Sequence, residues 1–161
     1  MTTKREQVIE IFSRFSEGDG PGNTRKPVTQ QEIDAAQEKC SVIFPDDLKD
    51  FWLNCGWGFL TVSKNNQTTG NFNFFMSPAF VAFALNRDIE HGFEEIEINE
   101  GYVPFFQFNE YSFCGMKNKA SGDRGIYIYV EDGVTPEKVS DDIWDFILKT
   151  WEDVDWFVNI D

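Results

Sequence analysis

The stretch TQQEIDAAQEKCSVIFPDDLKDFWLNCGWGFLTV, residues 29–62, contains start and stop signals for two consecutive helices. Thr29, followed three residues later by Glu32, fits a capping box, in which the two side chains satisfy backbone N–H groups at the start of a helix. Pro45 fits the first turn of a second helix, where its missing N–H costs little. Gly56 suits the end of this second helix, because glycine readily adopts the left-handed conformation that ends many helices.

Apolar residues recur every three or four positions in both predicted helices, which gives each helix one buried face. These faces consist of Ile33, Ala36 and Cys40, then Leu48, Phe51, Trp52 and Cys55. The apolar run at 57–62 that follows is typical of a strand. The stretch therefore predicts the order helix, helix, strand.

Similar patterns extend along the rest of the chain. Apolar periodicity predicts three more helices, at 4–16, at 78–90 and from Ser140 to about Trp151. Strand patterns occur at 57–62, 72–76, 93–99, 103–108, 111–116, 125–130 and 154–160. Because these strands follow one another through hairpin-length links, we predict an α+β fold with a mostly antiparallel sheet and helices packed on one face. Residues 1–161 are predicted to form a single domain, in which 1–28 supply an N-terminal helix and a loop that lead into the rest.

Three parts of the opening stretch resemble the SUKH superfamily: Glu32-Ile33, the phrase IFPDDLKDF at 43–51, and Gly56. The chain has Phe44-Pro45 where members often have Leu-Pro, and Gln37 where they often have Glu. The resemblance extends more thinly through Val103-Pro104-Phe105, Gly115, Ile126–Val130 and the final helix.

The SUKH superfamily joins fungal Smi/Knr-type regulators of cell-wall synthesis with bacterial proteins that confer immunity to polymorphic toxins. The resemblance implies a SUKH-like α+β domain that binds proteins and has no catalytic activity. For a bacterial member it implies an immunity protein, which holds a cognate toxin, often a nuclease, inactive by direct contact. The alternative is a regulatory or scaffold domain of the Smi/Knr type that binds other cellular proteins.

The charge of the chain is unevenly distributed. The net charge is −14, and residues 88–161 hold 18 acidic against 5 basic residues, whereas 1–87 hold 10 against 9. Such a field repels nucleic acid and anionic lipid and attracts a basic partner. We therefore expect a basic protein partner, in the immunity hypothesis the cognate toxin, and neither nucleic acid nor a membrane. Solubility alone is the alternative explanation of the acidity.

Acidic and aromatic residues of the second half are the candidates for partner contact, because rings anchor interfaces and charges steer association. The candidate residues are Glu94, Glu95, Glu97, Glu100, Asp141, Asp142, Asp145, Trp151, Glu152, Asp153, Asp155, Trp156 and Phe157. They are selected by charge and aromatic character alone, since no family motif assigns a contact residue. For the aromatic candidates, the alternative is that they seal one end of the sheet.

Residues that carry most enzyme chemistry are scarce in this chain. His91, the single histidine, precedes Gly92 at a predicted helix end, where an imidazole suits the helix dipole. The 3 cysteines lie on predicted apolar helix faces or in a strand, which predicts buried free thiols. No pair of these residues has zinc-ligand spacing, and the acidic groups do not match a calcium loop. We therefore predict no catalytic residue, no cofactor and no metal site; a small enzyme with an unrecognised carboxylate site is the minor alternative.

The N-terminal residues MTTKREQVIEIF include no apolar signal region, and no apolar run approaches the roughly 18 residues of a membrane span. Free thiols agree with a reducing compartment. We therefore expect a cytoplasmic protein.

Overall fold

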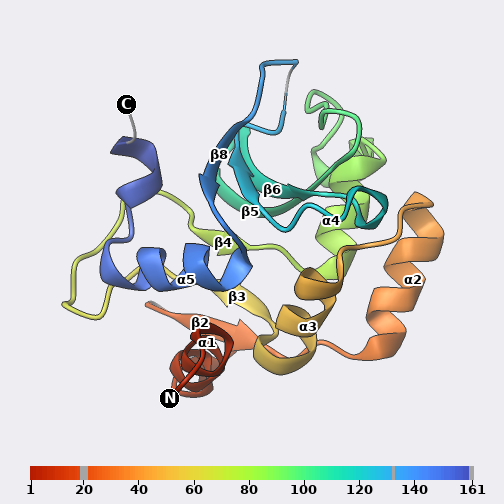
Figure 1. The fold of residues 1–161 in the computed structure, drawn as a ribbon. Helices are drawn as coiled ribbons and strands as arrows, with labels where there is room; N and C mark the ends of the chain where they lie inside the picture. The colour runs from red at the N-terminus through yellow and green to blue at the C-terminus, as the bar shows by residue number, and fades with distance from the viewer. Residues whose placement is uncertain (19–21, 132, 160–161) are drawn as a thin grey trace.

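The computed structural model describes residues 1–18, 22–131 and 133–159, and Figure 1 shows its fold. Among these residues, eight strands form one sheet in the order β1-β2-β3-β4-β5-β6-β7-β8. The strands are β1 (Ser16–Glu17), β2 (Thr24–Lys26), β3 (Trp57–Phe59), β4 (Phe74–Phe75), β5 (Tyr102–Asn109), β6 (Ser112–Lys117), β7 (Ile126–Ile128) and β8 (Glu137–Ser140). The α-helices are α1 (Lys4–Ser13), α2 (Gln30–Cys40), α3 (Asp46–Cys55), α4 (Pro78–Leu85) and α5 (Ile143–Glu152). The 3-10 helices are η1 (Ile89–His91), η2 (Lys119–Ser121) and η3 (Trp156–Asn159).

Strands that are neighbours in sequence are also neighbours in the sheet. β1 and β2 pair in parallel, and all other neighbouring strands pair antiparallel. The longest ladder joins β5 to β6, where Val103 pairs with Met116 and Gln107 with Phe113. The predicted α+β class with a mostly antiparallel sheet is confirmed.

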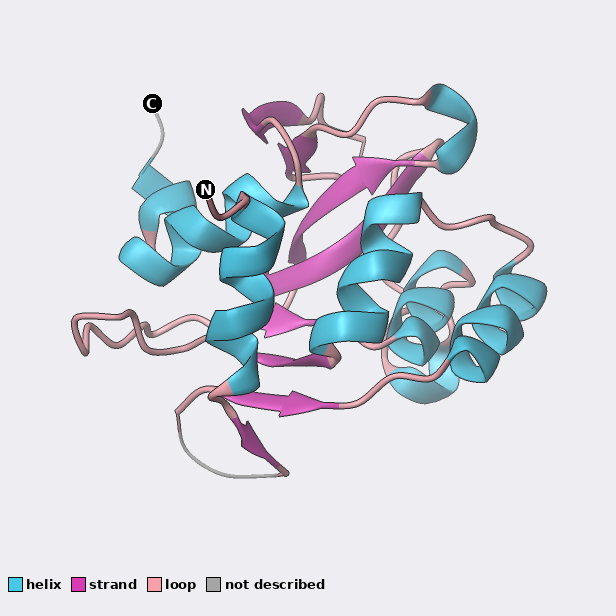
Figure 2. Ribbon diagram, turned by 60° about the horizontal axis from the view of Figure 1, so that its bottom comes forward, coloured by secondary structure: helices cyan, strands magenta, loops and turns pink. Residues whose placement is uncertain are grey.

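Helices α1, α3 and α5 lie on one face of the sheet (Figure 1), and Figure 2 shows helices standing in front of the strands. Phe75 of β4 contacts Phe12 of α1 and Phe51 of α3, with ring centroids 5.7 Å and 5.4 Å apart. Phe106 of β5, the pairing partner of Phe75, contacts Phe146 of α5 at 5.2 Å. Tilted and edge-to-face ring contacts therefore connect the sheet to its helices.

The helix signals of the opening stretch are present in the structure. The Thr29 hydroxyl accepts a hydrogen bond from the N–H of Glu32 at 3.2 Å, and the Glu32 carboxylate accepts from the N–H of Thr29 at 3.3 Å. Pro45 stands at the N-cap of α3, and Gly56 follows the last residue of that helix with φ +83°. These signals are local, which is why sequence alone identifies them.

Two glycines let β2 approach β3 closely. A Cβ on Gly56 would lie 2.1 Å from the backbone oxygen of Lys26, and a Cβ on Gly58 would lie 2.2 Å from that of Thr24. Only residues without a side chain allow this contact. The sequence analysis used Gly56 only as a helix stop and did not predict β2.

The connection after α4 differs from its prediction. The helix predicted at 78–90 ends at Leu85, and Arg87 adopts a left-handed conformation with φ +51°. The strand predicted at 93–99 is wrong, because turns occupy this segment and Ile98 forms only an isolated bridge to Glu131. The period-two pattern arises because alternate side chains are buried, although the backbone joins no ladder.

The C-terminal elements also differ. Asp142, rather than Ser140, caps α5, and Ser140 instead ends β8. The strand predicted at 154–160 is wrong: Trp156–Asn159 is the 3-10 helix η3, while residue 160 lies outside the described residues. The sequence analysis did not predict β1 or β8, which are 2 and 4 residues long and include few buried side chains.

Candidate functional site

The connection between α4 and β5, residues 88–101, presents a row of glutamates and is called the acidic loop here. Phe93 and Ile96 anchor it, with exposed fractions of 5% and 2%. The residues around these anchors point outward, and four of the predicted contact residues are exposed: Glu94, Glu95, Glu97 and Glu100. Glu90, which the sequence analysis did not select, is exposed as well, and Ile89 beside it has 68% of its surface exposed.

The glutamates of the acidic loop have no internal counter-charge. Among the described residues, no hydrogen bond or ion pair engages the side chains of Glu94, Glu95, Glu97 and Glu100. The nearby guanidinium of Arg87 donates to the backbone oxygen of Glu94 at 2.8 Å, so it is held by a carbonyl. These carboxylates are therefore exposed to solvent and form no ion pair among the described residues.

His91 is part of the frame of this loop. Its ring stacks on Phe83 of α4, with centroids 3.7 Å apart, and its Nδ1 lies 3.0 Å from the carboxylate of Asp88. The hydrogen bond with His91 lowers the pKa of Asp88. His91 was predicted at the end of the helix at 78–90, but α4 ends at Leu85, and His91 is instead the last residue of η1, which Gly92 follows with φ +83°.

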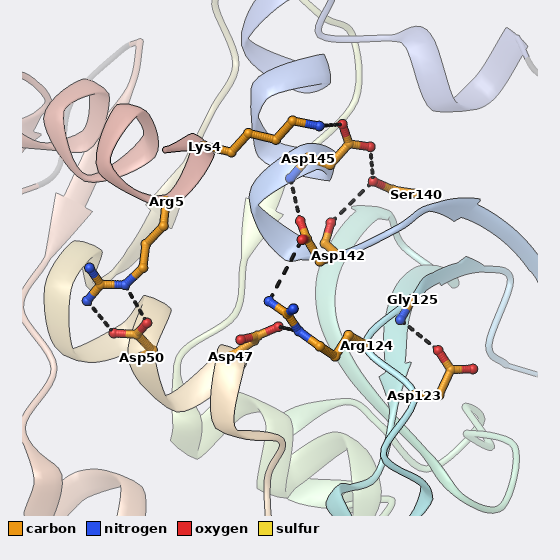
Figure 3. A network of polar contacts seen from close by, with 10 residues as sticks. All are labelled: Lys4, Arg5, Asp47, Asp50, Asp123, Arg124, Gly125, Ser140, Asp142 and Asp145. Carbon is orange, nitrogen blue, oxygen red and sulfur yellow. Dashed lines mark hydrogen bonds and ion pairs between the residues drawn. The ribbon is translucent and has the colours of Figure 1, made fainter. Parts of the chain in front are cut away.

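The second predicted acidic group, residues 141–155, is called the C-terminal acidic segment here, and Figure 3 shows how two of its carboxylates, those of Asp142 and Asp145, are engaged within the fold. Asp142 caps α5 by accepting from the N–H of Asp145 at 2.8 Å. Asp145 accepts from Lys4 of α1 at 2.8 Å and from the Ser140 hydroxyl at 2.5 Å, and it pairs with Lys149 at 3.0 Å. Burial alone would raise the pKa of Asp145, but these three partners together hold it well below its usual value.

The end of this segment fastens the long loop 63–71 to the C-terminus. Lys64 pairs with Glu152 at 2.5 Å, Gln67 donates to Asp153 at 3.1 Å, and Asn71 donates to Asp155 at 3.2 Å. These contacts join side chains more than 80 positions apart in sequence, at separations of 88, 86 and 84 residues. The carboxylates of Glu152, Asp153 and Asp155 therefore hold the loop 63–71 against the C-terminal end of the chain.

The aromatic residues of this segment pack internally as well. Phe157 is 1% exposed and contacts Phe106 and Phe108, so it belongs to the core and cannot anchor a partner. Trp156 donates its indole N–H to Thr150 at 3.0 Å and is half-buried. Trp151 is also half-buried, with its ring 5.9 Å from that of Phe15. Phe157 is therefore part of the core, whereas Trp151 and Trp156 pack against Phe15 and α5 with part of their surface still exposed.

The structure does not bring the two acidic groups together. In Figure 1 the acidic loop lies in the green segment at the upper right, above α4, whereas α5 and the C-terminus lie on the left. The five basic residues of 88–161 do not offset the acidic loop either, because each of them pairs with an aspartate. These pairs are Lys117–Asp123, Lys119–Asp46, Arg124–Asp47, Lys138–Asp141 and Lys149–Asp145. Within the described part of the chain, none of these five cations therefore forms an ion pair with a glutamate of the acidic loop.

A groove next to the acidic loop was missed by the sequence analysis. It is lined by Tyr111, Ser112, Tyr129, Glu131, Val134, Thr135 and Glu137 and is called the tyrosine groove here. Asn99 of the acidic loop joins it, because the Asn99 amide donates to the backbone oxygen of Val134 at 2.8 Å. The alternation of Tyr127 and Tyr129 against buried isoleucines was a sequence signal for exposed rings at this edge.

The thiols do not form a nucleophilic centre. Burial raises the pKa of Cys55 to about 12, and burial also raises the pKa values of Cys40 and Cys114. All three cysteines are free, as predicted. Within the described part of the chain, no group of three or more His, Cys, Asp or Glu side chains is arranged to hold a metal ion.

No helix in residues 1–18, 22–131 and 133–159 has the length and apolar character needed to span a membrane. A comparison with curated proteins finds no match to this chain. The model of the SMI1/KNR4 family (SUKH-1) matches residues 27–149, which include α2 to α4 and β3 to β8. This match covers most of the chain. It includes the capping box, Gly56 and Gly58, which allow the close approach of β2, and the acidic loop. The chain belongs to the SMI1/KNR4 family (SUKH-1).

Proposed function

We propose that this chain is a non-catalytic, cytoplasmic protein-binding domain that acts as an immunity protein. In this proposal, the acidic loop covers a basic surface of a cognate toxin and blocks it. The supporting observation is the row of exposed glutamates at 94, 95, 97 and 100, whose side chains have no partner among the described residues. Membership of the SMI1/KNR4 family supports a protein partner.

The acidic loop has the properties that electrostatic steering requires. Its charges are exposed and uncompensated, and clefts or surfaces of one sign raise association rates by about 10- to 1,000-fold at low salt. A nuclease must present a basic surface to hold nucleic acid, so an acidic loop competes for that surface directly. The exposed Ile89 adds an apolar contact at the edge of the charged row.

A regulatory or scaffold domain is the second candidate, because the SUKH resemblance implies both kinds of member. The two proposals differ in the fate of the partner. An immunity protein abolishes the activity of its toxin at a one-to-one ratio, whereas a scaffold leaves the activity of its partner intact. A minor third proposal, an enzyme with a carboxylate site, would require turnover of a substrate.

The test is capture of partners from the native organism with the purified chain as bait, at low and at moderate salt. We expect one basic protein, whose capture weakens as salt rises and whose toxic activity is lost in the complex. The variant Glu94→Gln/Glu97→Gln should weaken capture by about 3- to 10-fold at low salt. The control variant Glu6→Gln/Glu38→Gln removes the same charge from exposed positions on α1 and α2 and should leave capture unchanged.

Capture that is equally strong in both variants and indifferent to salt would overturn the role of the acidic loop. Capture of a partner that stays fully active would replace the immunity proposal with the regulatory one.

A further inference from the structure

The tyrosine groove lies at the edge of the acidic loop and combines exposed rings with carboxylates. It has a volume of about 560 Å³, and Tyr111 and Tyr129 are 47% and 43% exposed. This volume is within the usual range of ligand pockets, roughly 300–1,000 Å³. Aromatic side chains with half of their surface in water are the type of residue that most often anchors a protein interface.

The backbone at Tyr129 is held in an unfavourable conformation. Its φ is +59°, in the left-handed region, which costs a residue other than glycine about 1–2 kcal/mol. β7 ends one residue earlier, and the N–H of Tyr129 donates to the backbone oxygen of Phe113 at 2.9 Å. The ring of Tyr129 meets that of Phe108 edge-on at 5.8 Å, which fixes one side of it and leaves the other side exposed. Strain at an exposed aromatic residue indicates a role outside the fold.

The charges that line the groove have a single sign. Glu131 is 4% exposed and Glu137 is exposed, and none of the other lining residues is charged. The acidic loop continues this surface through Asn99. The side-chain amide of Asn99 donates a hydrogen bond to the backbone oxygen of Val134, and its side-chain oxygen accepts one from the N–H of Gly133 at 3.0 Å. A cation that enters the groove would meet ring faces and carboxylates together.

We propose that the tyrosine groove receives an arginine side chain of the basic partner. This inference rests on the proposed function: the acidic loop attracts the basic partner, and the groove then holds one arginine side chain of that partner. A guanidinium is planar, stacks on aromatic faces and is more weakly hydrated than an ammonium, so it suits a groove with Tyr111 and Tyr129 on its walls. The carboxylate of Glu137 supplies the acceptor for its fork of N–H donors.

The test is a titration of the ¹⁵N-labelled chain with acetyl-Gly-Arg-Gly-amide, followed by amide chemical shifts. We expect the shifts to concentrate at residues 111, 112, 129 and 134. The citrulline peptide has nearly the same shape without the charge and should bind at least about 5-fold more weakly. Tyr111→Ala should remove the shifts, whereas Tyr111→Phe keeps the ring face and should retain them.

Equal shifts with the arginine and citrulline peptides would overturn the inference, as would shifts that persist in Tyr111→Ala. The acidic-loop variant Glu94→Gln/Glu97→Gln distinguishes this failure from failure of the proposed function. If the peptide fails to bind but capture of the basic partner depends on salt and on Glu94 and Glu97, the groove is wrong and the proposed function stands. If the peptide binds the groove but no basic partner depends on those glutamates, the proposed function is wrong and the groove remains a cation site.

Discussion

The acidic loop and the C-terminal acidic segment are both rich in acidic residues, but they differ in whether their carboxylates form ion pairs. In the segment, Asp145 and Glu152 pair with Lys4 and Lys64, which come from other parts of the chain. In the loop, the glutamates around Ile96 have no such partner among the described residues. An acidic run is therefore a candidate binding surface only where no cation pairs with its carboxylates. Four predictions test this contrast, beginning with the largest change in stability.

The largest effect is expected at Asp145, whose carboxylate joins α1, β8 and α5. Asp145→Asn should lower the free energy of unfolding by about 2 kcal/mol, because charge-assisted hydrogen bonds from Lys4 and Lys149 are lost. The matched control is Asp141→Asn, since the Asp141 side chain is 90% exposed and, among the described residues, pairs with Lys138 alone. This control should change stability by less than about 0.5 kcal/mol in urea unfolding. Equal effects of the two variants would contradict the fastening role of Asp145.

The pH dependence of this contribution has a defined sign. The folded chain holds the pKa of Asp145 below its usual value, whereas the unfolded chain has a pKa of about 3.9. The stabilisation is therefore fully present above that unfolded value and is lost as pH falls through the lower folded pKa. Urea unfolding of the wild type and of Asp145→Asn should show a difference that is constant from pH 7 to pH 5. The difference should shrink by about 1 kcal/mol at pH 3. A difference that stays constant down to pH 3 would show that charge is not involved.

Asp142 tests whether an acid of this segment acts as a hydrogen-bond acceptor or as a charge. Asp142→Ala removes the cap of α5 and should lower the free energy of unfolding by about 1 kcal/mol. Asp142→Asn keeps an oxygen for the N–H of Asp145 and should lose only a few tenths of that value, because Arg124 approaches at the longer distance of 3.8 Å. Thermal unfolding of the two variants measures the difference. If Asp142→Asn lowers the free energy of unfolding as much as Asp142→Ala, the charge of Asp142 is its main contribution to stability.

The sequence predicted the parts of the fold that depend on near neighbours. The capping box of Thr29 and Glu32 and the start of α4 at residue 78 are both local, and both were predicted. β2 was missed because its position depends on close approach to Gly56 and Gly58, which are distant in the sequence. For the 93–99 segment, the alternation of exposed Glu95 and Glu97 with buried Ile96 and half-buried Ile98 resembled a strand, although Ile98 forms only an isolated bridge.

Prediction from near neighbours in sequence was even less successful for the candidate site than for the fold. Charge density alone selected Glu97 and Asp145 together, because sequence shows how many acids a segment holds and not which of them meet a cation. Lys149, four positions on, is a partner of Asp145 that helical spacing can suggest, but Lys4 lies 141 positions away, so only the fold reveals that second ion pair. Phe157 and Tyr129 illustrate the point for rings: the former was chosen as an anchor and is buried, while the latter was not chosen and is exposed.

The smallest effect is expected at the acidic loop, and its sign is opposite to that at Asp145. Glu94→Gln/Glu97→Gln removes two exposed like charges from a chain of net charge −14 and breaks no contact among the described residues. Relief of repulsion should raise the free energy of unfolding by about 0.3 kcal/mol at low ionic strength. The gain should disappear in about 1 M salt, where the Debye length falls to about 3 Å. Thermal unfolding in both buffers measures it, with Glu6→Gln/Glu38→Gln as the control from the nearly neutral first half. A loss of stability in the loop variant would mean that Glu94 and Glu97 also stabilise the fold. The contrast between the two acidic regions would then disappear.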